Sequence, residues 1–496
     1  LDRSVFATWS QVKEMEQSRL VEVASHTHNL HNGINANPSG GQLPAVIAPE
    51  YKNGKYETED AYKNRLKSDF TRSVQTLVNH IGKKPRVMVW PYGQFNDVAV
   101  QLARQAGMSH YFSLGEKIIN KVGDKHIGRL LLNAETDLNT VKNYLDGIDE
   151  SKQIQRVLHV DLDYVYDADK AQQAKNLDKL IDRIYRYGVT TVYLQAFSDP
   201  DGDGVADALY FPNKYLPVRD DIFGRIAWQL QTRAGVKVYA WMPVLAFDLR
   251  KSVKEAEYVI DSRTGKPSTK AYLRLSPYNK QNVEIIKSIY NDLSFYAKFN
   301  GILFHDDAFL TDFEGAEGDH AEGMVSPQAK QKTQDLIQLT HQLTDALKPY
   351  FLRGSYSLKT ARNLYASVIT NPNAEEWLAQ NLKTLTNNYD TTAIMAMPYM
   401  ENEQPISQEE AYQWFASLIE NVKAQAPLDK VLFEFQAVNW RTQKPIPESE
   451  LIDWMKLLQK NHIYSYGYYP DNFLTNQPDL NKMKPYFSVN TNVGKP

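Results

Sequence analysis

The chain has 496 residues, of which 42% are hydrophobic and 23% charged. At roughly 150 residues per domain this fits two or three globular domains and excludes a disordered or membrane-embedded protein. Its 56 basic and 59 acidic residues give a net charge of -3, so the basic surface that nucleic-acid binding requires is missing. Cysteine is absent, which excludes disulfides and thiolate metal sites.

The first residue of the chain bears on how the protein is processed, and the aromatic content bears on its ligand. Residue 1 is Leu rather than Met, so we expect a processed or truncated product whose export signal or lipid anchor lies upstream. No apolar run reaches the roughly 20 residues that cross a bilayer. With 30 Tyr, 19 Phe and 8 Trp, the composition favours a protein that stacks aromatic rings against sugars.

Residues 1–150 are predicted to alternate between helices and short strands. Thr8 and Gln11 have the spacing of a capping box, and Gly82 follows a run of apolar residues at helical spacing. The pattern predicts the second half of an α/β domain. The expected elements are helices that begin after Thr8, cover 66–81 and end at Gly107, with strands over 20–24, over 86–90 and near Tyr111.

From about residue 156 the pattern becomes a regular alternation of strands and helices. Helix signals include Pro327 after Ser326 and a capping box that begins at Ser407. Eight parallel strands with crossover helices close into a (β/α)8 barrel, so residues 151–496 are predicted to be a TIM-type barrel domain within an α/β protein. The expected strands are 157–163, 190–196, 237–244, 301–305, 363–369, 392–397, 431–435 and 463–468.

Three histidines follow the first predicted strand: His26, His28 and His31. Three imidazoles within six residues can supply two nitrogen ligands to a divalent metal. The alternative is that they are unrelated polar residues of a loop. The next predicted strand ends at Trp90 and Tyr92, which would form the wall of a sugar pocket or else pack in the core.

A cluster of carboxylates follows the fourth predicted barrel strand, at Asp306, Asp307, Asp312 and Glu314. Like charges that crowd one strand end raise one another's pKa. A raised pKa keeps a carboxylic acid protonated near neutral pH, so that it can protonate a glycosidic oxygen. A solvated acidic loop is the alternative.

Other predicted barrel strands also end in polar and aromatic residues. Period-two alternation places His159, Asp161 and Asp163 on one face of the first strand, although a buried core histidine is an equal alternative for His159. Strand seven brings Glu434, the best second carboxylate. The further candidates for sugar contacts are Trp241, Tyr272, Arg274, Tyr399, Trp440 and Tyr468.

Together these motifs resemble the polysaccharide deacetylases of carbohydrate esterase family 4, in the biofilm branch that deacetylates poly-β-1,6-N-acetyl-D-glucosamine and also has a C-terminal glycoside hydrolase barrel. The resemblance spans essentially all of the chain and implies that residues 1–150 are the C-terminal half of a NodB-like α/β deacetylase domain. It implies His26 and His31 as ligands of a divalent metal (zinc, nickel, cobalt or iron), with Trp90 and Tyr92 in the substrate groove. It places the third ligand, an Asp, and the catalytic base upstream of this chain, so we expect this chain to deacetylate poorly.

The same resemblance implies roles for the barrel. Asp306, Asp307, Asp312 and Glu314 would line the site for partly deacetylated glucosamine, with Asp312 as the catalytic acid. The implied function is N-deacetylation of the polymer together with endo-hydrolysis or binding of the partly deacetylated product, during biofilm polysaccharide export. We expect a monomer in the periplasm or on the periplasmic face of the outer membrane, with an export porin as partner. A non-catalytic scaffold that guides the polymer is the alternative.

The loop over 199–207 copies the spacing of a calcium-binding loop, with Asp199, Asp201 and Asp203 at alternate positions. Its twelfth position is Tyr210 rather than Glu, so the EF-hand interpretation fails. The loop is instead predicted to be a tight acidic turn that shapes a groove for cationic sugars.

Overall fold

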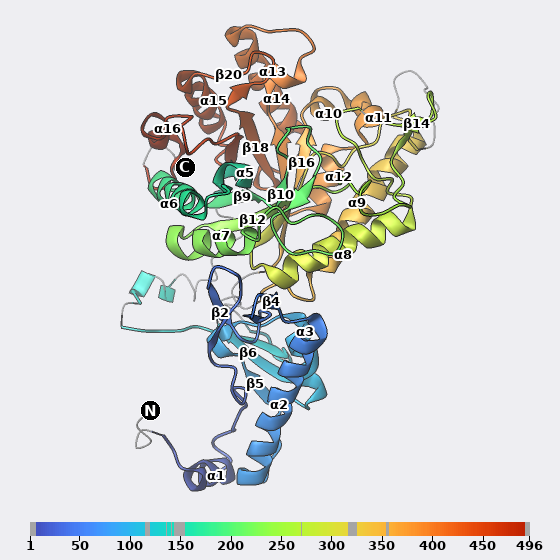
Figure 1. Cartoon of the computed structure of the whole chain (residues 1–496). Coiled ribbons are helices and arrows are strands. Elements are labelled where there is room, and N and C mark those ends of the chain that lie inside the picture. Colours follow the sequence, from blue (N-terminus) through green and yellow to red (C-terminus); the bar gives the residue numbers. More distant parts are fainter. Residues whose placement is uncertain are drawn as a thin grey trace. The chain divides into compact units, whose positions relative to one another are not determined.

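The computed structural model describes residues 6–114, 120–134, 136–139, 141–142, 154–268, 270–315, 325–353 and 357–491 (Figure 1). The chain divides into two compact units, and each is described by itself. Unit 1 comprises Leu1–Ser151, Ser294–Tyr296 and Lys348–Ser357; unit 2 comprises Lys152–Leu293, Ala297–Leu347 and Leu358–Pro496.

Unit 1 is built on a short parallel sheet in the order β5-β6-β7 with the long helix α2 (Glu59–Ile81). The Thr58 side chain caps the start of α2 by accepting a hydrogen bond from the Ala61 N–H, and Gly82 ends the helix with φ +78°, a left-handed conformation that favours glycine. Its other elements are α1 (Trp9–Gln17), β1 (Gly33–Asn35), β2 (Gln42–Pro44), β3 (Tyr51–Lys52), β4 (Lys55–Tyr56), β5 (Val87–Val89), the 3₁₀ turn Pro91–Gly93, α3 (Asp97–Gln105), β6 (His110–Leu114) and β7 (His126–Arg129).

The capping box at Thr8 is confirmed, whereas the strand expected over 20–24 is wrong. Leu20 is 91% exposed, and the described residues 20–24 form no strand. The segment joins the sheet at Ser25, through an isolated bridge to Met88. The Ser25 N–H donates to Val87 O, and the Val89 N–H donates to Ser25 O. This single bridge fixes the start of the segment that contains the three histidines.

Unit 2 is a closed barrel whose eight strands follow one another in chain order, with every neighbouring pair parallel. The predicted TIM-type barrel is confirmed. Burial of the strands on both faces explains their apolar sequences. The barrel strands are β8 (Arg156–Val160), β9 (Thr191–Gln195), β12 (Lys237–Met242), β15 (Gly301–Phe304), β16 (Lys359–Tyr365), β17 (Thr391–Met395), β18 (Val431–Gln436) and β21 (Tyr466–Tyr469).

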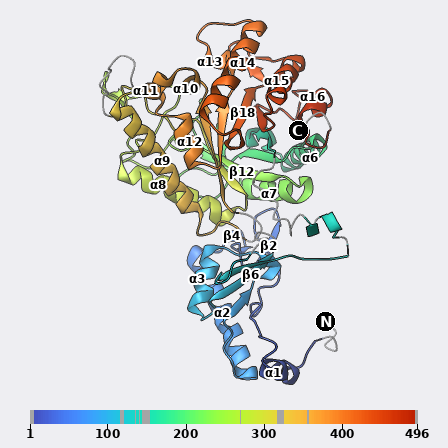
Figure 2. The ribbon, with the colours of Figure 1, turned by 180° about the vertical axis from the view of Figure 1, so that it is seen from behind.

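Helices surround these strands, and Figure 2 shows α8, α9, α12 and α14 from behind. The capping box at Ser407 is present, and the Ser326 hydroxyl accepts from the Ala329 N–H at the start of α9. The helices are α5 (Leu162–Val165), α6 (Lys170–Tyr187), α7 (Phe223–Gln229), α8 (Lys280–Tyr296), α9 (Pro327–Leu347), α10 (Ser367–Thr370), α11 (Glu375–Leu378), α12 (Leu382–Asn388), α13 (Pro398–Glu401), α14 (Gln408–Gln425), α15 (Glu448–Lys460) and α16 (Leu480–Phe487); the short strand pairs are β10 (Phe197–Ser198) with β11 (Ala208–Leu209), β13 (Ile260–Asp261) with β14 (Lys266–Pro267), and β19 (Val438–Asn439) with β20 (Lys444–Pro445).

Several predicted barrel strands differ in their bounds. The third ends at Met242 rather than at residue 244, and the eighth covers Tyr466–Tyr469 rather than 463–468. The first ends at Val160 rather than at residue 163, because Leu162–Val165 turns into a short helix. The fifth covers Lys359–Tyr365 rather than 363–369, since the apolar residues after it belong to α10. A short buried apolar run does not distinguish a strand from a helix, and this ambiguity shifted the fifth strand by four residues.

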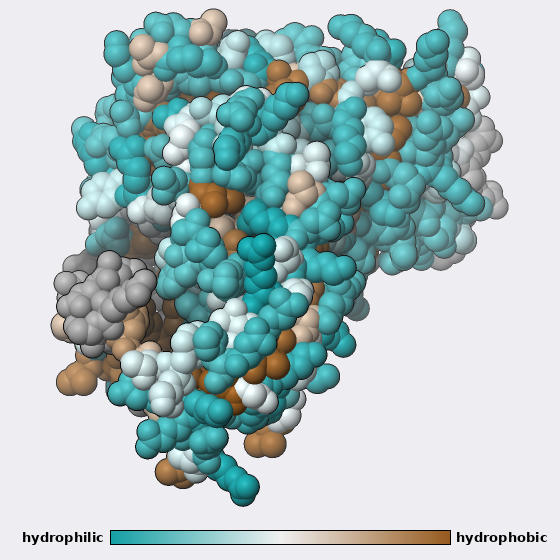
Figure 3. All heavy atoms as spheres, turned by 60° about the horizontal axis from the view of Figure 1, so that its bottom comes forward, coloured by the Kyte–Doolittle hydropathy of each residue, from teal (hydrophilic) through white to brown (hydrophobic). Residues whose placement is uncertain are grey.

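Figure 3 shows hydrophilic residues over most of the visible face, with hydrophobic residues in small separate groups between them. Among the described residues, no helix combines the length and the apolar character that a membrane span requires.

Candidate active site

A cavity of about 620 Å³ opens at the carboxyl ends of the barrel strands, where TIM barrels place their active sites. Each of the eight strands contributes a side chain, either from its last residues or from the loop that follows it. These side chains are His159 (β8), Gln195 (β9), Trp241 (β12), Asp306 (after β15), Asn363 (β16), Met395 (β17), Glu434 (β18) and Tyr469 (β21).

Asp306 is a charged carboxylate held by three donors. The hydroxyl of Tyr272 donates to both of its oxygens at 3.0 and 2.9 Å, and that of Tyr365 donates to Oδ2 at 2.8 Å. Its Oδ1 lies 3.0 Å from Nε2 of His305. Burial by itself raises the pKa of Asp306, but the charge of His305 and these hydrogen bonds outweigh it and hold the pKa below its usual value.

The ring of His305 completes this arrangement as a cation. Burial by itself lowers the pKa of His305, but Asp306 and Asp307 outweigh it and raise that pKa to about 10. The ring is therefore protonated at neutral pH, and it compensates the two neighbouring carboxylates.

Asp307 has a different function from Asp306 although it is the next residue. It is fully buried and accepts hydrogen bonds from the backbone N–H groups of Val244, Leu245 and Ala246. It is not among the described residues that line the cavity. The expectation that Asp307 is catalytic is therefore replaced by a structural role, in which it fixes the loop after β12.

Glu434 is the second carboxylate with a fixed orientation in the cavity. Its Oε1 lies 2.7 Å from Nε2 of His159, and its Oε2 accepts from the side-chain amide of Asn363 at 2.7 Å. His159 thus orients a carboxylate while it lines the cavity itself, and its Nδ1 has no hydrogen-bond partner among the described residues.

Asp161 and Asp163 both line the cavity, as the sequence predicted, but their surroundings differ. Asp163 pairs with Arg219 and accepts from the hydroxyl of Tyr210 at 2.5 Å. Asp161 receives only a 3.4 Å hydrogen bond from Tyr469, and its Oδ1 is buried without a partner among the described residues. Burial, together with the negative charge of Asp163, raises the pKa of Asp161 to about 7.

Aromatic side chains form much of the remaining wall. Of the predicted sugar contacts, Trp241, Tyr272 and Trp440 line the cavity. The Trp241 ring lies edge-on to His159, with ring centroids 5.1 Å apart. The buried Nε1 of Trp241 has no hydrogen-bond partner within the described part of the chain. A ligand that offers hydroxyl oxygens would provide one.

Besides Asp307 and Tyr399, four predicted residues of the barrel site do not line this cavity. Asp312 lines a separate hollow of about 320 Å³ with Arg263, Lys270 and Trp377. Arg274 and Glu314 are buried and form an ion pair with an N–O distance of 2.6 Å. Tyr468 is fully buried, and its hydroxyl donates to Asp471.

The placement of these four residues corrects the predictions made for them. The structure does not bring Asp312 into the barrel-mouth cavity, so the geometry does not support Asp312 as its acid. Arg274, Glu314 and Tyr468 present no surface to a substrate. Tyr399 is likewise not among the described residues that line the cavity. Its hydroxyl donates to Glu450 at 2.5 Å.

The structure also places in the site several residues to which the sequence assigned no role, namely Gln195, His305, Asn363 and Tyr365. Each is among the last residues of a barrel strand or directly follows it. Polar residues at strand ends were the available signal for Gln195 and Asn363. Tyr365 was hidden by the shifted bounds of β16, which placed it inside a strand rather than at its end.

In unit 1, His26 and His31 come together as predicted. Nε2 of His26 lies 3.0 Å from Nδ1 of His31, and Nδ1 of His26 lies 2.7 Å from the carbonyl oxygen of Val89. A carbonyl acceptor on one ring nitrogen orients the other toward a metal. Burial lowers the pKa of His26, which favours the neutral ring that metals bind. The pair thus fits two ligands of one metal; among the described residues, no third histidine or carboxylate joins it.

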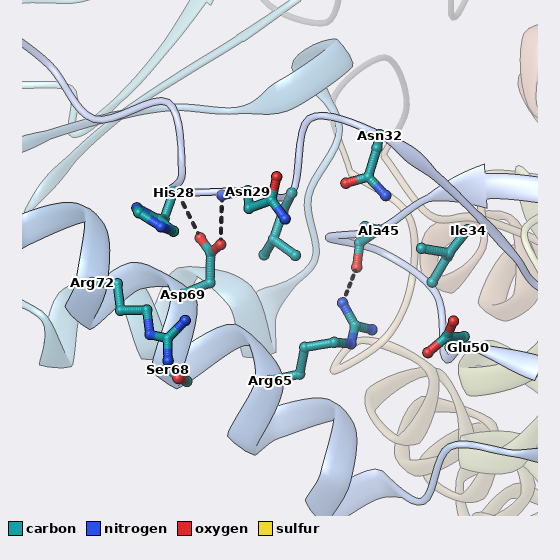
Figure 4. A pocket seen from close by; sticks show the side chains of 11 residues that line it. His28, Asn29, Asn32, Ile34, Ala45, Glu50, Arg65, Ser68, Asp69 and Arg72 are labelled. Atoms are coloured by element: carbon teal, nitrogen blue, oxygen red, sulfur yellow. Dashed lines mark hydrogen bonds between the residues drawn. The ribbon is translucent and has the colours of Figure 1, made fainter.

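The segment between the two histidines is fixed by Asp69 of α2. Asp69 accepts from the backbone N–H groups of His28 and Asn29 at 2.8 and 2.7 Å, as Figure 4 shows. The side chain of His28 lines a cavity of about 460 Å³ together with Arg72 and Asp69. His28 is thus not part of the histidine pair, in agreement with the resemblance.

Of the two aromatic residues after β5, only Tyr92 is available to a ligand. Tyr92 is 47% exposed, and its ring lies edge-on to His31 with centroids 4.6 Å apart. Trp90 is 1% exposed and stacks on Phe95 and Tyr111. The prediction that Trp90 contacts substrate is wrong, because Trp90 is a core residue.

Two family models match this chain, one in each part of the sequence. The family model "Hypothetical glycosyl hydrolase family 13" matches residues 159–469, and the model "Polysaccharide deacetylase" matches residues 1–111. The solved glycoside hydrolase domain of PgaB (BpsB) from Bordetella bronchiseptica is 39% identical, with a TM-score of 0.62 over 68% of this chain and 100% of that domain. Fold and site thus define a glycoside hydrolase barrel joined to polysaccharide deacetylase sequence.

Two curated relatives specify the family. The poly-beta-1,6-N-acetyl-D-glucosamine N-deacetylase of Escherichia coli K12 is 40% identical over 99% of this chain and 75% of its own length. The enzyme of the same name from Staphylococcus aureus MSSA476 is 28% identical over 28% of this chain and 42% of its own length. The chain belongs to the poly-beta-1,6-N-acetyl-D-glucosamine N-deacetylase family.

Proposed function

We propose that the barrel of unit 2 hydrolyses partly deacetylated poly-β-1,6-N-acetyl-D-glucosamine within the polymer. One observation supports this most strongly: a charged Asp306, further carboxyl groups and aromatic rings line a single cavity at the barrel mouth. Glycoside hydrolysis requires a pair of carboxyl groups beside the scissile bond, and aromatic faces pack against pyranose rings.

Asp306 has the geometry to stabilise positive charge at the anomeric carbon. Tyr272, Tyr365 and His305 fix its carboxylate before substrate binds, so little reorganisation is needed when charge develops. Glu434 is similarly held by His159 and Asn363 and positions the sugar through its own fixed carboxylate.

The preference for deacetylated sugar follows from the acidic loop after β10. Asp199, Asp201 and Asp203 line the same cavity, and their carboxylate oxygens lie within 4.8 Å of one another. Such a concentration of negative charge attracts the ammonium groups of glucosamine. Fully acetylated polymer lacks these groups and is a poor substrate.

We also propose that unit 1 supplies part of a metal-dependent deacetylase site. His26 and His31 hold the metal, Val89 orients the ring of His26, and Tyr92 faces the substrate. A divalent metal supplies Lewis-acid activation for amide hydrolysis when it is bound. Zinc, nickel, cobalt and iron all accept imidazole nitrogen. Acetate release from acetylglucosamine oligomers, measured with and without each added metal, tests this proposal.

The experiment for the barrel is a reducing-end assay on partly deacetylated polymer. New reducing ends support hydrolysis. Binding of the polymer without new reducing ends would favour a non-catalytic scaffold that guides it. Binding alone does not separate these two functions, because both use the same acidic cavity.

We propose residues 1–150 and 151–496 as the two domains. We further propose a monomer in the periplasm or on the periplasmic face of the outer membrane, with an export porin as partner; this rests on the resemblance to the biofilm export branch. Fractionation of cells and sedimentation of the purified chain test location and oligomeric state.

A further inference from the structure

The barrel unit has a second hollow beside the large cavity at the strand ends. Its volume is about 320 Å³, and it is lined by Arg263, Lys270, Thr311, Asp312, Phe313 and Trp377. None of these six is among the described residues that line the larger cavity. The hydrolase function proposed for the barrel therefore leaves this hollow without a role.

The loop that contains Asp312 is fixed by buried polar contacts. Glu314 forms an ion pair with Arg274 at 2.6 Å and accepts from the Thr311 N–H at 2.8 Å. The ammonium group of Lys332 donates to the carbonyl oxygen of Thr311 at 3.0 Å. Because these contacts hold the backbone on both sides of Asp312, little ordering of the loop is needed when a ligand binds.

Trp377 is exposed although the short helix that contains it is held in place. It lies on α11 and is 37% exposed. Glu375 of the same helix is buried and accepts from the hydroxyl of Thr333 at 2.8 Å and from the side-chain amide of Asn381 at 3.2 Å. Aromatic faces pack against pyranose rings, and a ring on a fixed helix loses little freedom on binding. Trp377 is thus suited to hold a sugar ring at the hollow.

The charges of the hollow favour a neutral sugar. Arg263 is paired with Asp261 through hydrogen bonds of 3.0 and 2.7 Å and stacks on the ring of Phe313. Lys270 and Asp312 have opposite charges, and neither forms an ion pair within the described part of the chain. One donor and one acceptor suit hydroxyl and amide groups, whereas the crowded carboxylates of the larger cavity attract ammonium groups.

We infer that this hollow is a second sugar-binding site, which takes an N-acetylglucosamine residue of the polymer whose deacetylated part occupies the larger cavity. The inference rests on the function proposed for the barrel. Lys270 lines the hollow, and Ala271 and Tyr272 line the cavity. The chain turns between them, since the Tyr272 N–H donates to the carbonyl oxygen of Lys270 at 2.9 Å. Two residues span at most about 7 Å, so one polymer can cross this segment and occupy both sites.

Binding of a fully acetylated β-1,6-linked N-acetylglucosamine hexamer, measured by calorimetry on the full chain, tests the site without any cleavage. This probe lacks the ammonium groups that the acidic cavity attracts. We expect Trp377→Ala to weaken its binding about tenfold, whereas Trp377→Phe, which keeps an aromatic ring, stays within about threefold of the parent. Tyr185→Ala is the matched control, because it removes an aromatic side chain of α6 that is 68% exposed, and it binds the hexamer like the parent.

Cleavage of partly deacetylated polymer gives a second readout. Trp377→Ala should raise KM for long polymer about three- to tenfold with kcat unchanged, because the hollow contributes binding away from the reacting bond. A short glucosamine oligomer that fills only the cavity should have the parental KM. An equal rise of KM for the long and the short substrate contradicts a separate site.

Three results would overturn the inference. They are a parent that does not bind the acetylated hexamer, equal binding by the parent and Trp377→Ala, and a loss of binding in Trp440→Ala that matches the loss in Trp377→Ala. The last result would place the acetylated sugar in the larger cavity, which Trp440 lines. A parent that cleaves no polymer, while Trp377→Ala still loses the hexamer, rejects the hydrolase function and leaves the second site standing.

Discussion

Replacement of Asp307 by alanine should destabilise the barrel, although its neighbour Asp306 has the catalytic geometry. Asp307 is fully buried and accepts from the three successive backbone N–H groups of Val244, Leu245 and Ala246, at distances between 2.6 and 3.0 Å. Alanine provides no acceptor, so three buried donors lose their partner.

The magnitude follows from the cost of an unsatisfied buried donor, about 1–3 kcal/mol for each group. Partial relaxation of the loop after β12 recovers some of this, so we expect Asp307→Ala to lower the free energy of unfolding by about 3–6 kcal/mol. Asp306→Asn is the comparison. It leaves the three backbone donors paired, so the protection of their amides should stay at the parental level, although it removes one of the two carboxylates that face His305.

Urea unfolding of the full chain and hydrogen exchange at Val244, Leu245 and Ala246 measure the effect. We expect a lower unfolding midpoint for the barrel and faster exchange of these three amides in Asp307→Ala. If its midpoint and the protection of these amides equal those of the parent, Asp307 does not have the structural role assigned to it.

Four further outcomes are expected. Asp306→Asn should lower polymer cleavage about 10²–10⁴-fold while oligomer binding, measured by calorimetry, persists; cleavage at the parental rate would remove Asp306 from the mechanism. Asp312→Asn should cleave within a few-fold of the parent, since Asp312 lies in a separate hollow, and a loss as large as that of Asp306→Asn would return it to the site. His26→Ala should weaken zinc binding at least about tenfold in calorimetry, whereas His28→Ala should not; equal affinities in both variants argue against the histidine pair. The pKa of His305 is raised to about 10, so its stabilising contribution is complete below about pH 6.5 and is lost as pH rises through 10. The stability difference between the parent and His305→Gln should therefore shrink between about pH 7 and pH 11, and a constant difference in urea midpoints contradicts this.

The barrel could be predicted because its signal is repeated. Strands buried on both faces alternate with amphipathic helices. An error in the bounds of one strand therefore does not change the number of strands that the sequence predicts. The bounds of β16 show the limit, since the apolar residues around Ala366 suit a strand or a helix equally well. Only tertiary packing decides that Ser367–Thr370 is helical.

The sequence also did not determine which residues of a strand face the cavity. Tyr468 was predicted to contact sugar, yet Tyr468 is buried in the core and Tyr469 lines the cavity. Successive residues of a strand point to opposite faces, so a strand assigned correctly still leaves two choices for its aromatic residues.

The role of each carboxylate could not be predicted from its position in the chain. Asp306 and Asp307 are adjacent, but backbone donors surround one and tyrosine hydroxyls the other. Asp312 lies only a few residues further on and belongs to a different hollow. Asp161 was recognised as a site residue, whereas its long hydrogen bond from Tyr469 joins residues that are far apart in the sequence.

We propose that the barrel-mouth cavity cleaves partly deacetylated polymer, and mass spectrometry of the products formed by the parent chain decides this. We expect short oligosaccharides with new reducing ends that contain free glucosamine, produced by the parent and absent with Asp306→Asn. Polymer that is bound but stays at its original length, or oligosaccharides that the parent and Asp306→Asn release equally, would contradict it.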